Sequence, residues 1–376
     1  MIRRTDIQRL IDSPPRDRPV VSLYLDMAVN SENKRTFNVF LNKQKSRFAE
    51  LDSDREPHHR VALGATFDGI ERWIDEEFDE ANKGIALFAE VGGDRLDAFQ
   101  FPVRVQNRLE IGDWPVIGPL TEILVSNPAY GVILVDREHL RLVRIRLGEV
   151  RQERRFAPDA YPTAHDVHAG GVATKDFQRR KAEEVRHFFK EFAHEVAEFD
   201  RQHDIDAFVL LGTNENVQQF RDFLAASITD RVIHNAQAPI DASGAEILER
   251  LQRVFSQTAE RDAASAIDLV HDRVRHQHRA VAGIGPTLEQ LQEGKIDRLV
   301  IARDLESEGA QCTRCGFYLA HPSNDGACPY CGGQVRHGID LVESMLRIAA
   351  HQQVALEFVD RDAMSDLAGV GALLRF

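Results

Sequence analysis

Short apolar runs alternate along this chain with longer stretches whose apolar residues recur every three or four positions. The runs at 20–25 and 84–88 are typical of buried strands, and the stretches at 38–48 and 61–78 predict helices. Together they predict an α+β unit over about the first 125 residues. An Asn-Pro step within residues 127–130 indicates the end of this unit, because the residue before a proline disfavours helix.

A second unit opens with a predicted hairpin, in which residues 132–135 turn at 136–139 and return through 140–147. A long helix is predicted at about 176–200. Its apolar residues keep helical spacing and therefore form a core stripe rather than a base-stacking surface. The members of this stripe are Phe177, Val185, Phe188, Phe189, Phe192, Val196 and Phe199.

Strands at 208–212 and 231–233 then alternate with a helix through Phe220 and a helix at 244–255. This alternation predicts a three-layer α/β domain that ends near residue 275. The last hundred residues repeat the alternation and predict a third α/β unit, with helices at 287–292 and 341–350 and strands at 299–301, 354–359 and 372–376.

The predicted fold class is therefore α/β with three domains. An α+β N-terminal domain spans residues 1–127, a central α/β domain spans 128–276, and a C-terminal α/β domain spans 277–376. A small insert at about 305–337 interrupts the last domain and contains every cysteine of the chain.

The four cysteines form two Cys-X-X-Cys pairs, Cys312 with Cys315 and Cys328 with Cys331. Two thiolates from each of two tight turns make a tetrahedral donor set that suits one structural Zn²⁺. Glycines follow each pair, so we expect each turn to close and to point its amides at the sulfurs. Two disulfides are the alternative, but the chain opens without an apolar signal segment, as expected of a reduced cytosolic protein. Catalytic zinc is disfavoured, because four protein ligands leave no open position for water.

Charge and composition narrow the kinds of partner. The chain has 376 residues and a formal net charge of −13, which argues against a uniform nucleic-acid coat but leaves room for local basic patches. No apolar run approaches the ~18 residues of a membrane span. We therefore expect no membrane partner and a cytoplasmic location.

Two regions of the second unit are locally basic. Lysine and arginine side chains there can bind RNA phosphates, although such a run of charged residues more commonly forms a solvent-exposed surface with no partner. The first region lies at the start of the predicted long helix and comprises Lys175, Arg179, Arg180, Lys181, Arg186 and Lys190. The second region is open between RNA contact and a structural role, and comprises Arg141, Arg144, Arg146, Arg151, Arg154 and Arg155.

His165, His168 and Asp136 are weaker candidates for a metal site. His165 and His168 precede a glycine pair with no third ligand at metal spacing, so contacts to backbone or RNA are favoured over a metal site. Asp136 lies at the end of a predicted strand, where a nuclease can place a metal carboxylate. A turn-forming role is favoured for Asp136, because aspartate commonly stabilises turns through its own side chain.

Three phrases of the sequence resemble one family when taken in order. Residues 170–181 read Gly-Gly-Val-Ala-Thr-Lys-Asp-Phe-Gln-Arg-Arg-Lys, and residues 369–376 read Gly-Val-Gly-Ala-Leu-Leu-Arg-Phe. Residues 283–301 read Gly-Ile-Gly-Pro-Thr-Leu-Glu-Gln-Leu-Gln-Glu-Gly-Lys-Ile-Asp-Arg-Leu-Val-Ile. With the cysteine insert between the last two phrases, they resemble the archaeo-eukaryotic class-1 release factor and Pelota family. The likeness is to its bacterial branch, including ribosome hibernation factors.

The resemblance implies a decoding-site domain, a ribonuclease-H-like central domain that reaches the peptidyl-transferase centre, and a C-terminal domain that meets a translational GTPase such as elongation factor Tu. It further implies that the ribosome is the main partner, through rRNA and a P-site tRNA. The loop and helix start that would contact RNA comprise His168, Gly170, Gly171, Lys175, Arg179, Arg180, Lys181 and Arg186.

The chain departs from the release factors of this family at one decisive position. Release factors act on peptidyl-tRNA with a Gly-Gly-Gln loop, whereas Val172 follows Gly170 and Gly171 here. Valine has no side-chain donor or acceptor with which to position water. The one Gly-Gly-Gln, which ends at Gln334, lies in the cysteine insert and is best explained by the turn there.

These departures lead us to assign no catalytic residue. No Asn-Ile-Lys-Ser phrase of stop-codon readers is present either. The expected function is binding to the A site of idle or stalled ribosomes, in hibernation or Pelota-like rescue, without efficient peptidyl-tRNA hydrolysis. One alternative is a release or rescue factor with a non-standard glycine loop, whose backbone amides alone bind the oxyanion. Another is an RNA-binding adaptor that does not act on ribosomes.

Overall fold

The computed structural model describes residues 4–12, 18–51, 57–157, 173–321 and 326–376. The chain divides into two compact units, one formed by Met1–Ser126 with Glu260–Phe376 and the other by Asn127–Ala259. Both units are mixed α/β, which confirms the predicted fold class; the division into three domains stays a prediction. Within the described residues, no helix has both the length and the apolar character needed to cross a membrane.

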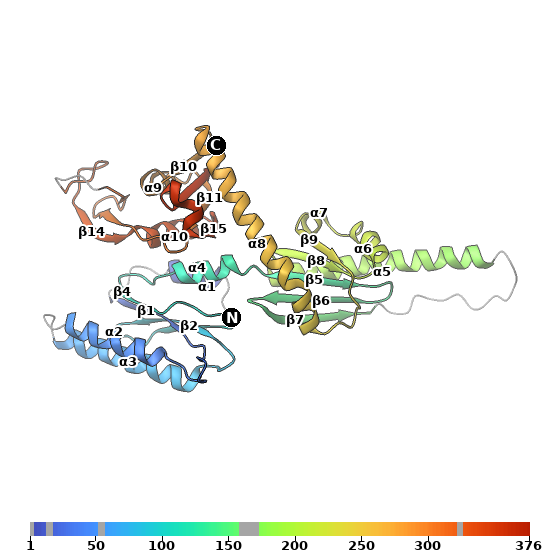
Figure 1. Ribbon diagram of the computed structural model, residues 1–376, viewed down its shortest axis with the longest axis horizontal. Coiled ribbons are helices and arrows are strands. Elements are labelled where there is room, and N and C mark those ends of the chain that lie inside the picture. Colours follow the sequence, from blue (N-terminus) through green and yellow to red (C-terminus); the bar gives the residue numbers. More distant parts are fainter. Residues whose placement is uncertain (1–3, 13–17, 52–56, 158–172, 322–325) are drawn as a thin grey trace. The chain divides into compact units, whose positions relative to one another are not determined.

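The N-terminal part of the first unit is an antiparallel sheet covered by a helix pair (Figure 1). In spatial order its strands are β3 (Leu96–Phe101), β2 (Gly84–Glu90), β1 (Val20–Asp26) and β4 (Arg108–Gly112). One face packs against α2 (Phe37–Leu51) and α3 (Pro57–Glu77). The two inner strands, β1 and β2, are almost wholly buried, so both consist mainly of apolar runs that predict strands from the sequence. The edge strands β3 and β4 were not predicted, because they alternate with polar residues and are only partly buried.

The C-terminal part of the first unit has three layers. Its central sheet consists, in order, of β10 (Ala280–Ala282), β16 (Val370–Leu374), β11 (Ile296–Ala302) and β15 (Ala355–Val359). One face packs against α9 (Ile284–Gln292) and α10 (Leu341–His351). The other packs against η1 (Arg361–Leu367) and the second half of α8 (Gly244–Arg275). The strands predicted near 300, 356 and 373 are confirmed, whereas the three-residue β10 was too short to predict.

Two short helices from the N-terminal part of the chain pack on the C-terminal part. They are α1 (Arg4–Asp12), which contacts α10, and α4 (Gly118–Ser126), which contacts both α10 and β15. Val125 of α4 joins the apolar core formed by α9, α10 and the C-terminal sheet. The two ends of the chain therefore share one core, although more than a hundred residues separate them.

The second unit is built on a mixed five-stranded sheet. In spatial order the strands are β7 (Glu149–Phe156), β6 (Leu140–Arg146), β5 (Tyr130–Val135), β8 (Ala207–Leu211) and β9 (Val232–Ala236). Strands β5, β6 and β7 form an antiparallel meander, and β5, β8 and β9 run parallel. The hairpin predicted at 132–147 is thus confirmed.

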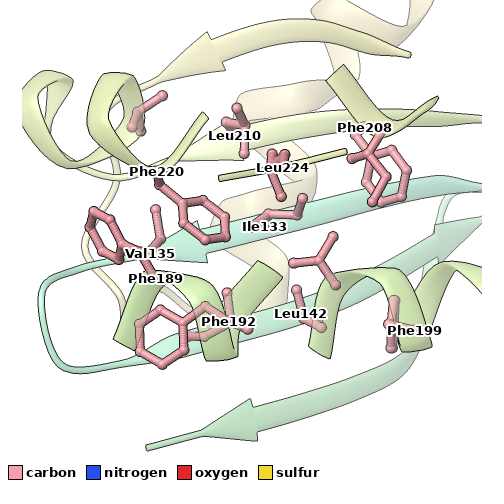
Figure 2. Close-up of a cluster of buried hydrophobic side chains, with 14 of the residues drawn as sticks. Ile133, Val135, Leu142, Phe189, Phe192, Phe199, Phe208, Leu210, Phe220 and Leu224 are labelled. Carbon is pink, nitrogen blue, oxygen red and sulfur yellow. The ribbon is translucent and has the colours of Figure 1, made fainter. Parts of the chain in front are cut away.

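A phenylalanine-rich core lies between this sheet and its helices (Figure 2). The covering helices on this face are α5 (Ala173–His203), α6 (Asn214–Arg221) and α7 (Ala226–Thr229). Phe189, Phe192 and Phe220 meet at ring centroid distances of 5.3–6.4 Å. The core stripe predicted for the long helix is confirmed from Val185 onward, and the side chain of Phe177 lies outside the described residues.

The opposite face of the second unit packs against the first half of α8. Phe255 of this helix stacks on Tyr130 of β5 at a centroid distance of 3.7 Å. The helix was predicted to end at residue 255, and that boundary is wrong, because α8 continues to Arg275. The continuation is rich in alanine and charged residues and buries mainly Ala266 and Val270, so its apolar stripe is narrow.

Truncation of a core phenylalanine tests the packing of the second unit. Phe192 is fully buried, and its replacement in F192A leaves a cavity among four other rings. We expect the free energy of unfolding of this unit to fall by about 3–5 kcal/mol, measured by denaturant-dependent hydrogen exchange of β5 and β6. In the control V39A, at a residue that is 73% exposed, the change is within about 0.5 kcal/mol. An equal effect of both substitutions would contradict this assignment of the core.

Candidate metal centre and RNA-contact helix

The cysteine segment forms a small sheet of its own between β11 and α10. Its three antiparallel strands, in spatial order, are β13 (Tyr318–Leu319), β12 (Glu308–Cys312) and β14 (Val335–Asp340). Cys312 ends β12, and the second cysteine pair lies just before β14. The sheet therefore brings together two cysteine pairs that the sequence separates by twelve residues.

Each cysteine pair lies in a tight turn closed by a glycine. In the first turn the amide of Gly316 donates to the carbonyl of Cys312 at 3.0 Å, and in the second the amide of Gly332 donates to the carbonyl of Cys328 at 2.8 Å. Both glycines have positive φ, +76° and +70°, a conformation that glycine adopts without a Cβ penalty. The glycines close the turns as predicted, with their own amides bonded to cysteine carbonyls. In the first turn other amides point at a sulfur, as predicted, because Arg314 and Cys315 donate to Sγ of Cys312.

The four sulfur atoms lie within 4.8 Å of one another. Sγ of Cys312 is 3.4 Å from that of Cys331, and Sγ of Cys315 is 3.8 Å from that of Cys328, while all four cysteines are free thiols. Tetrahedral coordination at ~2.3 Å from a metal would place sulfurs ~3.8 Å apart. The observed spacings bracket that value, so this donor set fits one metal ion.

Backbone amides favour the thiolate form at the first turn. The amides of Cys315 and Arg314 each donate to Sγ of Cys312 at 3.4 Å. These bonds, the one from Cys315 above all, lower the pKa of Cys312 to about 6. A thiolate is the form that binds metal, so the turn prepares Cys312 as a ligand before any ion arrives.

Gly333 is explained by close packing of the two turns. A Cβ at this position would lie 2.7 Å from Cβ of Arg314 and 3.2 Å from Sγ of Cys312. The amide of Cys328 also donates to the Gly333 carbonyl at 2.7 Å. The Gly-Gly-Gln that ends at Gln334 is therefore part of the metal turn.

The cysteine sheet is anchored on α9 by a residue that sequence reasoning missed. The side chain of Gln292 accepts from the amide of Tyr318 at 2.7 Å and donates to its carbonyl at 3.1 Å. The hydroxyl of Tyr330 donates to Glu289 at 3.1 Å. A glutamine at the end of an amphipathic helix gives no sign of such a pairing, because its partner is a backbone 26 positions away.

Metal removal tests the cysteine cluster. Because the sheet owes its closure to the two turns, we expect a chelator at neutral pH to raise hydrogen exchange at least tenfold over 308–321 and 326–340. Exchange in β5, β6 and α5 of the second unit stays unchanged. The variant C328S should reproduce this pattern without chelator and lose the bound ion in native mass spectrometry. Unfolding of the whole chain on chelation would contradict a local structural site.

The predicted RNA-contact residues fall into three groups. His168, Gly170 and Gly171 lie outside the described residues, as do Val172 and His165. Lys175 and Arg180 lie on α5, but their side chains are outside the described set. Arg179, Lys181 and Arg186 are exposed on α5, so these three are accessible to a partner.

The first half of α5 lies beyond the core of its unit. Within the described side chains, the first fully buried one on this helix is Phe188, and the helix extends past the sheet in Figure 1. Contacts between side chains four residues apart support the exposed half: Arg179 lies 4.0 Å from Glu183, and Nε2 of His187 lies 3.0 Å from Glu191. The arrangement presents a basic helix directly after the glycine pair.

The second basic region has a structural role at its centre. Arg141, Arg144 and Arg146 are at most 8% exposed. Arg141 donates to both carboxylate oxygens of Glu153 at 3.0 Å and to the carbonyls of Ile240 and Ala242. Its guanidinium thereby lowers the pKa of Glu153. RNA contact by these three strand arginines is therefore wrong, because the sheet and the segment before α8 already enclose them.

Asp136 forms a turn and gives no sign of a metal site. Its carboxylate accepts from the amides of Glu138 and His139 at 2.7 and 2.6 Å. Among the described residues, the four cysteines form the one cluster of three or more ligand side chains within metal-binding reach. The favoured turn role of Asp136 is thus the one observed.

Comparison with known proteins agrees with the family resemblance. Residues 115–256 match the model of bacterial archaeo-eukaryotic release factor family 10. A peptide chain release factor subunit 1 from Thermococcus onnurineus (strain NA1) is 22% identical over 295 residues, which cover 69% of each chain. Among solved structures, Archaeoglobus fulgidus Pelota aligns with 80% of this chain and 81% of its own at 13% identity and a TM-score of 0.30.

Saccharomyces cerevisiae Dom34, described as a translation termination-like factor, likewise aligns with 80% of this chain and 81% of its own, at 10% identity and a TM-score of 0.42. The family match spans the part of the sequence that contains the glycine pair and α5. By sequence, residues 115–256 are therefore similar to bacterial archaeo-eukaryotic release factor family 10, and 69% of the chain is similar to an archaeal peptide chain release factor subunit 1.

Proposed function

We propose that this protein is a translation factor that binds the A site of idle or stalled ribosomes and does not hydrolyse peptidyl-tRNA efficiently. One observation carries the proposal: a glycine pair without its glutamine leads into α5, whose exposed basic half lies beyond the core. A helix placed this way can enter an RNA-lined channel and exchange counterions with phosphates. Its partners would be rRNA and a P-site tRNA, which implies a cytoplasmic location.

The absence of release chemistry follows from the side chain after the glycines. Ester hydrolysis needs a group that positions water and donors that stabilise the developing oxyanion. Val172 supplies neither from its side chain. Backbone amides near the glycines could still bind an oxyanion, so a release or rescue factor with a non-standard loop is the second candidate function.

We further propose that the cysteine cluster holds one structural Zn²⁺. Four thiolates at tetrahedral spacing are a donor set that Zn²⁺ prefers, and their two turns leave no ligand position for substrate. The ion would fix the cysteine sheet against α9. A translational GTPase such as elongation factor Tu is the proposed partner of the C-terminal part.

Charge reversal on α5 tests ribosome binding. In the variant K181E/R186E, we expect co-sedimentation with vacant ribosomes at moderate salt to weaken at least tenfold. The slope of log affinity against log salt concentration should become less negative by up to about two, because two phosphate contacts are lost. The matched control R221E/R253E changes charge equally at exposed sites of the same unit and should bind like the wild type. Equal weakening by both variants would argue for a general charge effect instead.

Restoring the glutamine tests the release chemistry. With ribosomes that hold peptidyl-tRNA, we expect no peptide release by the wild type and measurable release by V172Q, because a glutamine then follows the glycine pair. The inactive reference is V172Q combined with G171W, whose bulk prevents the glycine conformation. Release by the wild type that G171W abolishes would establish the second candidate function. Failure of wild type to co-sediment with ribosomes would refute both.

A further inference from the structure

A six-residue segment joins the two parts of the first unit. We call residues 113–118 the strap; it runs from β4 to the start of α4. Its middle residue is fixed to β1: the amide of Val116 donates to Oγ of Ser22 at 2.9 Å, and the hydroxyl of Tyr24 donates to its carbonyl at 2.6 Å. Both β1 side chains are buried. The N-terminal sheet therefore holds the strap through polar groups that have no access to water.

The same strap is held from the other side by α10. The amides of Ile117 and Gly118 donate to the two carboxylate oxygens of Glu343, at 2.5 and 2.9 Å. Arg347, one turn further along α10, donates to the carbonyl of Pro115 at 2.8 Å, and its guanidinium lies 4.6 Å from the ring centroid of Trp114. Glu343 thus caps a helix that begins 225 residues earlier in the chain.

The fit between strap and helix is close. A Cβ on Gly118 would lie 3.0 Å from Oε2 of Glu343 and 3.2 Å from Cδ1 of Leu346. Further along α4, Arg303 pairs with Glu122 at 3.1 Å and donates to Oγ of Ser126, the last residue of the helix, at 3.3 Å. Arg303 also pairs with Asp360 at 3.2 Å. Both ends of α4 are therefore attached to the C-terminal part, and the Glu343 end is the one that depends on a buried carboxylate.

The charge on Glu343 is poorly compensated. Its side chain is 12% exposed, and Arg347, the nearest cation, lies 4.0 Å away. The other charged or titratable groups that act on this site are Asp340, which ends β14 and caps α10, Tyr24 of β1, Arg108 and Glu110 of β4, and Tyr318 of β13. Burial outweighs the two amides and Arg347, and with the like charge of Asp340 it raises the pKa of Glu343 to about 7.

We propose that the strap, Glu343 and Arg347 form a pH-sensitive latch that holds the N-terminal sheet on the C-terminal core and closes more tightly as the pH falls below neutral. When the latch opens, water reaches Glu343 and its pKa returns toward the ordinary value of 4.5. The closed state therefore binds a proton more strongly than the open state. The added stability is complete below the open-state pKa and is lost as the pH rises through the closed-state pKa.

Hydrogen exchange of the full chain measures the latch directly. The readout is the exchange of peptides that cover the strap and α4, at pH 6 and pH 8, corrected for the intrinsic rate at each pH. With pKa values of about 7 closed and 4.5 open, the opening constant should rise about tenfold from pH 6 to pH 8. In E343Q, which cannot titrate, it should not change with pH. The control E306Q, at an exposed glutamate, should behave like the wild type.

Two further measurements keep the proposal testable if E343Q folds poorly. G118A should open the latch at every pH, because its Cβ meets the carboxylate and Leu346. Carboxyl ¹³C resonances of the wild type should show one glutamate that titrates near pH 7. The proposal is overturned if every glutamate titrates near 4.5, if wild-type exchange is independent of pH, or if E343Q keeps the pH dependence.

Discussion

Buried backbone groups need hydrogen-bond partners, and in the strap this requirement joins the two ends of the chain. The strap has no strand beside it to supply a ladder, so side chains must satisfy its amides and carbonyls. Ser22 and Tyr24 supply them from the N-terminal sheet, and Glu343 and Arg347 supply them from α10. The strap is therefore hydrogen-bonded to both parts of the first unit, and α4, which follows it, adds apolar contacts to the C-terminal core.

Much of the fold could be predicted because apolar periodicity reports burial directly. The inner strands and the phenylalanine stripe of α5 are continuous or regularly spaced apolar runs, and the structure buries them as expected. Elements with half-buried or alanine-rich faces left a weaker pattern. The edge strands β3 and β4 and the continuation of α8 beyond residue 255 were missed for this reason.

The candidate sites divide in the same way. The cysteine cluster could be predicted because the spacing of metal ligands is a local property of the sequence. Two turns and a short sheet are enough to bring the four sulfurs together. Contacts between residues far apart in the sequence produce no recognisable local sequence pattern. The pairing of Gln292 with Tyr318 and the cap that Glu343 provides for α4 depend on the folded arrangement. For the strand arginines the sequence left RNA contact and a structural role open, and burial decides between them. Arg141 pairs with Glu153, and Arg144 donates to Gln152.

The close approach of Gly118 to α10 has an evolutionary consequence. With a Cβ, residue 118 would press on the carboxylate of Glu343 and on Leu346, so a larger residue there is tolerated only if the helix also changes. Substitutions at position 118 should therefore be coupled among relatives to those at 343 and 346, although Gly118 and Glu343 lie 225 residues apart. A lineage that loses both the glutamate and the leucine would be free to lose the glycine as well.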